Sequence, residues 1–180
     1  MAATKHAQAI QQDSQTYLTE ALFQLLEKKT LSEIKITELV ARAGVSRMAF
    51  YRNYDSVEDI LRQHFAPKLT HLFDNVIFEQ SDTVKYDDMQ AFFDAFASEL
   101  RLSLKAHFEY VIRDLFTENM ARYYANWPNL SPEQLKYWQV FMTNGVYGIW
   151  REWLLTGQKE SLTDLHALIK KLQASTESAL

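Results

Sequence analysis

The sequence predicts an all-α protein, and three observations support this prediction. Only four glycines and three prolines occur among 180 residues, so few positions interrupt regular backbone structure. Apolar residues recur mainly three or four positions apart, which is the spacing of one helix face, and no alternating stretch is long enough to predict a strand. With 47% hydrophobic and 13% aromatic residues, the chain can bury a sizeable core. We expect about nine helices.

Three helices are predicted in the N-terminal part of the chain. Apolar spacing predicts the first over residues 13–29 and the second over residues 36–43. Gly44 suits the end of the second helix, because glycine readily takes the left-handed conformation there. Ser46 suits the N-cap of a third helix over residues 47–54. The last two helices and their tight turn predict a helix-turn-helix.

The fourth helix should begin at Ser56, and Pro67 should limit or kink it. The apolar pattern then continues to about Glu79. Residues 80–86 show no periodic pattern, which predicts a loop. Aromatic and aliphatic stripes over residues 89–116 predict further helices.

A strong helix start stands near the C-terminal end of the chain. Ser131, Pro132 and Gln134 form an S-x-x-Q cap with proline at the first helical position. The helix that follows is apolar on nearly all sides, which predicts burial against more than its own domain. With a last helix after Ser161, it predicts half of a four-helix dimer interface. The residues expected there are Gly145, Gly148, Ile149, Trp153, Leu165, Ile169 and Leu172.

Charge divides the chain into two regions. The first 62 residues hold eight basic and eight acidic residues, so the net charge of −4 arises wholly in the remainder. Between Leu39 and Tyr54 there are three arginines and no acidic residue. A basic stretch in an acidic protein indicates a polyanionic partner. We therefore predict a DNA-binding domain over residues 1–62 and a helical ligand-binding and dimerisation domain over residues 63–180.

The predicted third helix has two different faces. Phe50 and Tyr54 lie four residues apart and share the face that should pack inside the domain. The opposite face carries guanidinium groups, a phenol and a thioether, which are groups that contact phosphates, guanine edges and thymine methyls. Its residues are Arg47, Met48, Tyr51 and Arg52. The alternative interpretation is an ordinary helical subdomain with a solvated basic face.

The run from Leu39 to Ile60 resembles the helix-turn-helix of the tetracycline-repressor (TetR) family of bacterial transcription regulators. The matching features are the turn Ala43-Gly44-Val45-Ser46, the recognition-helix core Phe50-Tyr51-Arg52, Tyr54 where the family usually has Phe, and Asp55-Ser56 before the next helix. Lys35 and Val57 depart from the residues that this family often has at their positions.

This resemblance implies a homodimer that places two recognition helices in successive major grooves of a near-palindromic operator in double-stranded DNA. By the same match, base edges are read by Arg47, Met48 and Arg52. Backbone contacts are assigned to Thr37, Ser46 and Tyr51, with Asn53 beside them. A small-molecule effector or a protein partner bound to the C-terminal region would change the tilt of the fourth helix, and with it the spacing of the two DNA-reading parts, as in a repressor.

The C-terminal run Gly145-Val146-Tyr147-Gly148-Ile149-Trp150-Arg151-Glu152-Trp153-Leu154 more loosely resembles a TetR subgroup that includes regulators of dihydroxyacetone kinase genes. This second match depends on the placement of glycines and aromatic residues. Some members of that subgroup act with a partner protein, so a protein partner is the alternative to a small-molecule effector.

The large aromatic residues of the C-terminal region have two interpretations. At helical spacing such residues are most often plain core. They could instead line a ligand pocket, with polar side chains that orient the ligand. The residues of such a pocket would be Phe96, His107, Tyr110, Arg113, Trp138, Phe141 and Met142.

Composition argues against several other kinds of site. The absence of cysteine removes disulfides, thiolate metal sites and cysteine nucleophiles, and it fits a reducing cytoplasm. The five histidines are isolated, so we expect no metal site and no cofactor. The start has no signal-peptide core and no run approaches about 18 apolar residues. We expect a cytoplasmic protein without a membrane partner.

Two rival functions remain at this stage. An enzyme would have to use Glu99, Asp114 or His107, but no nucleophile elbow, phosphate-cradling loop or paired acid–base motif supports it, so we do not predict an enzyme. A helical adaptor that binds only protein is the second rival.

Overall fold

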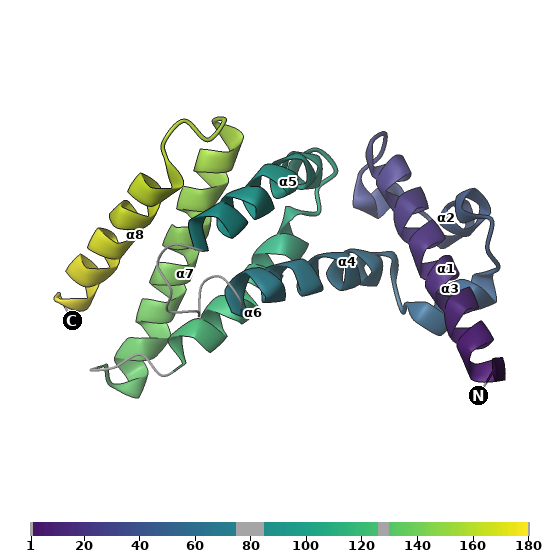
Figure 1. Cartoon of the computed structure of the whole chain (residues 1–180), viewed down its shortest axis with the longest axis horizontal. Coiled ribbons are helices and arrows are strands. Elements are labelled where there is room, and N and C mark those ends of the chain that lie inside the picture. The colour runs from purple at the N-terminus through teal and green to yellow at the C-terminus, as the bar shows by residue number, and fades with distance from the viewer. Residues whose placement is uncertain (1, 75–84, 126–129, 180) are drawn as a thin grey trace. The chain divides into compact units, whose positions relative to one another are not determined.

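The computed structural model describes residues 2–74, 85–125 and 130–179, with side chains described from residue 11 onward apart from Lys85. Within these ranges the chain forms eight α-helices and one short 3-10 helix, η1 (Figure 1). The prediction of an all-α protein is confirmed, with a helix count close to the expected nine.

The chain packs as two compact units. We call the first unit, Met1–Pro67 with Leu102–Ile112, the head, and the second, Lys68–Arg101 with Arg113–Leu180, the body. Most of the head comes from the N-terminal helices. Their bounds are α1 Ala2–Leu26, η1 Leu31–Glu33, α2 Ile36–Ala43, α3 Arg47–Asn53 and α4 Val57–Leu72.

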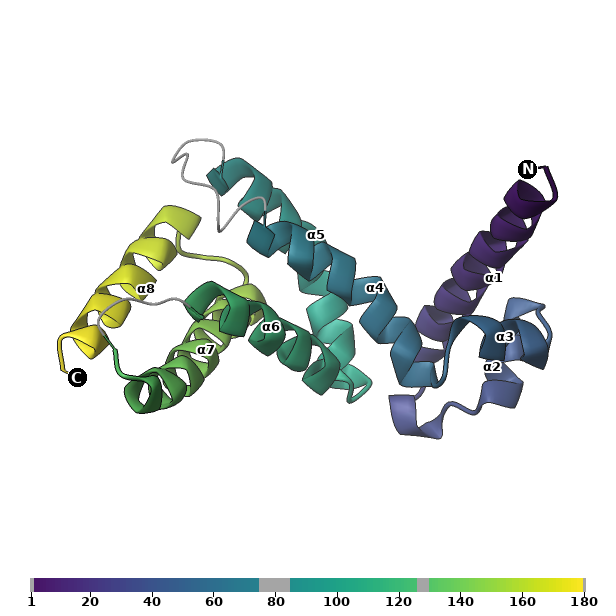
Figure 2. The same cartoon turned by 90° about the horizontal axis from the view of Figure 1, so that it is seen from below.

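The core of the head is built on one face of α1. Leu18, Leu22 and Leu25 are buried there, as their spacing predicts. Helices α2 and α3 both pack against α1 and contribute Leu39 and Phe50, which are fully buried (Figures 1 and 2). The predicted bounds of α2 and α3 agree with the structure to within one residue.

One helix prediction in the head is corrected, and Pro67 does not end the helix that it was expected to limit or kink. Helix α1 begins at Ala2 and not near Asp13. Residues 2–12 are rich in alanine and glutamine, which favour helix without forming an apolar stripe, so a search for apolar periodicity misses them. Helix α4 continues through Pro67 to Leu72. The buried side chains of Phe65 and Leu69 on either side of Pro67 hold it against neighbours despite the lost backbone hydrogen bond.

The turn between α5 and α6 packs in the head, although it is distant in sequence. The Leu31 N–H donates to the carbonyl oxygen of Ala106 (2.9 Å), and the Lys105 ammonium donates to the carbonyl oxygen of Glu27 (2.7 Å). His107 adopts the left-handed conformation in this turn, with φ of 58°. No Gly or Pro marks this turn, so it could not be predicted from turn residues.

The body contains the remaining helices: α5 Lys85–Lys105, α6 Glu109–Tyr124, α7 Pro132–Leu155 and α8 Leu162–Glu177. The predicted cap of α7 is confirmed, since the Gln134 N–H donates to Ser131 Oγ (3.3 Å) and the Ser131 N–H donates to Gln134 Oε1 (3.0 Å). Ser161 caps α8, since its Oγ accepts the Asp164 N–H (3.1 Å). The predicted loop over residues 80–86 lies mostly outside the described residues, and its last two positions are helical.

Aromatic side chains fill the core of the body. The Phe93 ring contacts Trp150 (5.1 Å between centroids) and Trp153 (5.4 Å), and the Phe116 ring contacts Trp150 (5.3 Å), all edge to face. Trp153 Nε1 donates to the carbonyl oxygen of Glu160 (2.9 Å). For these residues the interpretation as plain core describes the packing.

Two general features of the described part of the chain bear on function. Its helices are each too short or too polar to cross a membrane. Within the same residues, no group of three or more His, Cys, Asp or Glu side chains is placed to hold a metal ion.

Candidate functional site

The turn between α2 and α3 sets the direction in which α3 leaves the head. Gly44 has φ of 67°, a left-handed conformation that strains any side chain even though the space around it is open. The Val45 N–H donates to the Val40 carbonyl oxygen (3.1 Å) and the Gly44 N–H to that of Ala41 (3.4 Å), which is the Schellman pattern. Helix α2 therefore ends where the sequence predicts.

A serine cap then starts α3. Ser46 is extended, and its Oγ accepts the Ala49 N–H (3.0 Å), so one of the orphan donors of the first turn is satisfied. Because α3 has only seven residues, it depends on packing to stay helical.

The packed face of α3 is aromatic. Phe50 is fully buried and Tyr54 is 4% exposed, with ring centroids 6.0 Å apart. Burial raises the pKa of the Tyr54 phenol, and a hydrogen bond with Thr19 partly opposes that rise. Tyr54 is therefore a neutral core residue, and the predicted inward pair is buried as expected.

The opposite face of α3 lies in solvent. Arg47 and Arg52 are exposed, Met48 is 77% exposed and Tyr51 is 55% exposed. The buried ring of Phe50 contacts the Tyr51 ring edge to face (5.2 Å), which supports the exposed phenol from below. Among the described residues neither guanidinium has a hydrogen-bond or ion-pair partner. The face thus presents two uncompensated positive charges, a phenol and a thioether together.

The third arginine of the basic stretch has a different role. Arg42 donates to Gln24 Oε1 (3.0 Å), and Lys29 forms an ion pair with Glu38 (2.6 Å). The first contact joins α2 to α1, and the second joins α2 to the turn that follows α1. They therefore position the helix-turn-helix, which separates Arg42 from the arginines of the exposed face.

The remaining predicted DNA contacts are placed unequally. Thr37 is exposed in the first turn of α2, and Ser46 is exposed while serving as the N-cap. Asn53 differs, because it is half-buried and its Nδ2 donates to the Ala49 carbonyl oxygen (2.7 Å) while its Oδ1 is buried. Its amide nitrogen is thus bonded to the backbone of α3, which distinguishes Asn53 from the exposed residues.

The seven residues predicted to line a pocket do not form one set. Phe96, Trp138 and Met142 are buried in the body. Phe141 is 63% exposed and Arg113 is exposed. His107 and Tyr110 belong to the head.

The residues predicted for a dimer interface also divide. Trp153, Leu165 and Ile169 are buried within a single copy and pack in the core of the body. The other four predicted interface residues are at least partly exposed. Gly145 and Gly148 are exposed, Ile149 is half-buried, and Leu172 is 45% exposed.

An exposed apolar stripe on α7 was missed by the sequence analysis. Tyr137, Val140 and Phe141 are 71%, 59% and 63% exposed and lie three and four residues apart, on one helix face. Their spacing was the signal that could have located it. Helix α8 lies beside α7 and adds Leu168, 48% exposed, to Leu172 (Figures 1 and 2). We call these five residues the α7–α8 apolar face.

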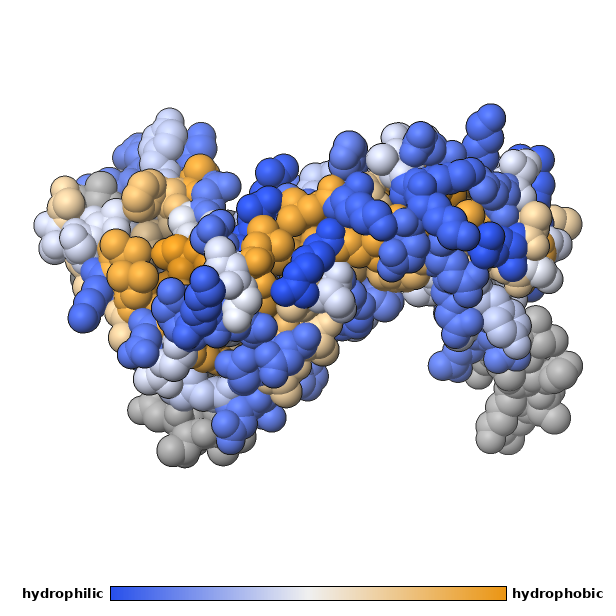
Figure 3. All heavy atoms as spheres, turned by 90° about the horizontal axis from the view of Figure 1, so that it is seen from above, coloured by the Kyte–Doolittle hydropathy of each residue, from blue (hydrophilic) through white to orange (hydrophobic). Residues whose placement is uncertain are grey.

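The visible surfaces of the two units differ in polarity. In Figure 3, apolar patches reach the surface of the body, whereas the surface over α1, α2 and α3 is mostly polar. Scattered exposed apolar residues are normal on proteins, but a row along one helix indicates a contact surface.

Comparison with known proteins finds a family and a shared fold. Residues 83–175 match the family model described as "Transcriptional regulator C-terminal region", of the TetR type. The crystal structure of a TetR transcriptional regulator from Streptococcus agalactiae 2603V is similar with a TM-score of 0.58 and 17% identity, covering 96% of this chain and 99% of that chain. The fatty acid degradation regulator FadR from Bacillus halodurans gives a TM-score of 0.44 and 14% identity over 93% and 96% of the two chains. No curated protein sequence matches.

Proposed function

Because this chain belongs to the TetR family of transcriptional regulators, we propose that it is a homodimeric DNA-binding repressor controlled through its body. This family consists of regulators and not of enzymes, so the enzyme rival is set aside. The matched segment covers most of the body and residues 102–112 of the head, and it leaves out the helix-turn-helix. The DNA-reading role therefore depends on the geometry of the head.

The exposed face of α3 is the observation that carries the proposal. Arg47 and Arg52 stand on it without an acidic residue in the first turn of the helix, and Met48 and Tyr51 lie between them. Arginine can bind guanine through two hydrogen bonds, a thioether can contact a thymine methyl, and a phenol can donate to a phosphate. The packed pair Phe50 and Tyr54 holds these groups on one side.

Two copies are needed to read a near-palindromic operator. We infer that the α7–α8 apolar face joins them, because the face is exposed in one copy and Gly145 and Gly148 allow a second helix to approach closely. Each copy would then place one α3 in a major groove. Half-site centres about 34–36 Å apart, or a multiple of that distance, would fit such a dimer.

Control of DNA binding would act through α4. Its N-terminal part lies in the head, where Tyr110 donates to Glu58 Oε2 (2.6 Å) and the Phe65 and Phe108 rings stack with centroids 6.2 Å apart. Helices α4, α5 and α6 all contribute residues to both units. An effector bound by the body would therefore change the tilt of α4, and the half-site distance would no longer match.

A protein partner in place of a small effector is the second candidate for control. Residues 145–154 loosely resemble a subgroup that includes regulators of dihydroxyacetone kinase genes. Some members of that subgroup act with a partner protein. The packing of the body favours it in one respect, since Phe93, Phe116 and Trp150 fill the core by contacting one another. We propose this subgroup as the finer placement within the family.

Selection from random-sequence DNA by the purified full chain tests the proposed function. We expect a near-palindromic motif with half-sites one helical turn apart, and a mobility shift with DNA upstream of the chain's own gene. A chain that enriches no motif from random-sequence DNA, and does not shift the DNA upstream of its own gene, would be an adaptor and not an operator-binding repressor.

A further inference from the structure

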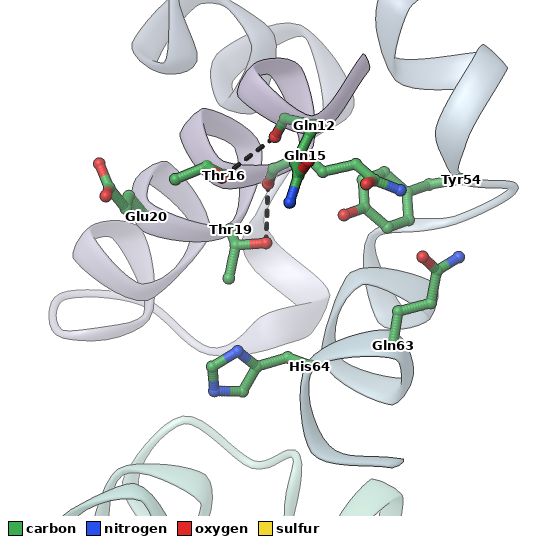
Figure 4. Close-up of a pocket in the computed structure, with 8 residues that line it drawn as sticks. All are labelled: Gln12, Gln15, Thr16, Thr19, Glu20, Tyr54, Gln63 and His64. Atoms are coloured by element: carbon green, nitrogen blue, oxygen red, sulfur yellow. Dashed lines mark hydrogen bonds between the residues drawn. The ribbon is translucent and has the colours of Figure 1, made fainter. Parts of the chain in front are cut away.

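A concave feature of the head lies apart from the exposed face of α3. It is a cleft of about 410 Å³ between α1, Tyr54 and α4, open to solvent (Figure 4). None of the four exposed residues of α3 lines it. Its volume falls in the range of small-molecule sites.

Six of the eight lining residues carry a carboxamide or a hydroxyl group. Gln12, Gln15 and Gln63 contribute the carboxamides, and Thr16, Thr19 and Tyr54 contribute the hydroxyls. Both kinds of group can donate and accept hydrogen bonds. A ligand whose groups both donate and accept hydrogen bonds would therefore find partners among these lining residues.

Part of this wall is already fixed in place. The Thr16 and Thr19 hydroxyls donate to the carbonyl oxygens of Gln12 (3.0 Å) and Gln15 (2.9 Å). Thr16 keeps its lone pairs for a ligand, whereas Thr19 is also hydrogen-bonded with Tyr54. Gln63 Nε2 donates to the Asn53 carbonyl oxygen (3.3 Å) and to Asp59 Oδ2 (3.2 Å), which leaves Gln63 Oε1 as an acceptor. Groups held by their own structure lose little freedom when a ligand binds.

The charges of the lining residues disfavour two classes of ligand. No Lys or Arg lines the cleft and Glu20 does, so a phosphate or another anion would meet no compensating charge. An apolar ligand would leave several polar groups without hydrogen bonds. The His64 ring is held at 4.8 Å from the Phe23 ring and 4.9 Å from the Phe65 ring, and it supplies one flat wall.

We propose that this cleft binds an uncharged polyhydroxylated small molecule, such as a monosaccharide or a sugar alcohol. Each hydroxyl of such a compound both donates and accepts, as the wall requires, and its carbon face can lie on His64. The bound molecule would join α1 to the first turns of α4 within the head. This site is additional to any effector site in the body.

Nuclear magnetic resonance of the isotope-labelled full chain tests the proposal. Glucose, mannitol and glycerol are the probes, with glucose 6-phosphate as the anionic comparison, each titrated to its solubility limit. We expect saturable shifts in residues 12–20 and 63–64 with at least one neutral probe, and binding of the phosphate ester at least about tenfold weaker. The absence of a saturable shift with every neutral probe, or tighter binding of the ester, would overturn the proposal.

Two variants and a matched control separate this site from non-specific sugar contact. Gln15→Leu and Gln63→Leu should each weaken binding of the neutral probe by about tenfold, because each removes wall donors or acceptors. Gln11→Leu changes an exposed glutamine on the same helix outside the cleft, and it should bind as the unaltered chain does. Unchanged binding by both cleft variants would overturn the proposal.

Discussion

Helix α3 in the head and helix α7 in the body are built alike but expose opposite chemistry. Each buries one aromatic face, with Phe50 on α3 and Trp150 on α7. The exposed face of α3 carries guanidiniums and a phenol, whereas that of α7 carries large apolar groups such as Val140 and Phe141. Burial explains why both are helices, and only the exposed residues indicate what each helix binds.

The difference also bears on how each surface behaves without a partner. Exposed guanidiniums are well solvated, so the α3 face is stable alone and can bind and release DNA. Exposed apolar side chains gain roughly 25 cal/mol for each Å² removed from water, so the α7–α8 apolar face favours a lasting contact. We therefore expect a persistent dimer that binds DNA reversibly.

The largest expected effect comes from the packed face of α3. Phe50→Ala should lower the free energy of unfolding by about 3–5 kcal/mol, because it leaves a cavity where a fully buried ring packs. Tyr51→Ala, at the adjacent exposed ring, should change it by about 0.5 kcal/mol or less while weakening DNA binding. Urea denaturation followed by circular dichroism measures both. Equal destabilisation by the two variants would contradict the division of α3 into a packed and a reading face.

The next effect tests the apolar face of the body. Val140→Glu combined with Phe141→Glu should raise the dimer dissociation constant by about 100-fold or more, since it places charges where an apolar contact is proposed. Light scattering after size exclusion measures the mass at micromolar concentration. Tyr17→Glu, which alters a 52% exposed aromatic residue of the head, is the control and should leave the dimer intact. A dimer that survives the double substitution would place the interface elsewhere.

A smaller effect distinguishes the arginines of the head. Arg47→Ala should weaken operator binding by about 1–3 kcal/mol and binding to random DNA by less, as expected for a contact to a base edge. Arg42→Ala should weaken binding to the two DNAs by similar and smaller amounts, because Arg42 positions α2 through Gln24 and does not lie on the exposed face. Fluorescence anisotropy at several salt concentrations measures both affinities. Equal losses on the two DNAs would make Arg47 a phosphate contact.

The sequence predicted the head more closely than the body, for a physical reason. Gly44, Ser46 and the Phe50–Tyr54 pair act through local geometry, so their roles follow from spacing alone. The roles of Trp153, Leu165 and Ile169 depend on which apolar face of a helix meets its own domain and which meets another copy. Spacing cannot separate two apolar faces of one helix.

Other features depended on contacts distant in sequence. The α5–α6 turn packs in the head through Lys105 and Ala106, and neither residue type is a turn signal. The polar cleft combines residues of α1 with Gln63 and His64, about fifty residues later along the chain. Asn53 resembled a DNA contact by position, and only its bond to Ala49 shows that its carboxamide is engaged.

The smallest expected effect concerns a charge of the head that already has partners, in contrast to those of the α3 face. The Glu33 carboxylate accepts two hydrogen bonds from Thr30, one from its backbone N–H (2.8 Å) and one from its hydroxyl (2.8 Å). These bonds, the backbone one most strongly, lower the pKa of Glu33 below the ordinary 4.5. The folded chain therefore holds this proton less tightly than the unfolded chain does. The stabilisation is complete above about pH 4.5 and is lost as the pH falls below that value.

Glu33→Gln should remove this part of the pH dependence while keeping an oxygen for the Thr30 N–H. The melting temperature of the variant should fall less steeply than that of the unaltered chain as the pH drops below about 4.5. Thr30→Ala keeps the backbone donor, which is the larger cause of the lowered pKa, so it should retain most of the original slope. Identical slopes for Glu33→Gln and the unaltered chain would show that the Thr30–Glu33 contact adds nothing to the stability of the head.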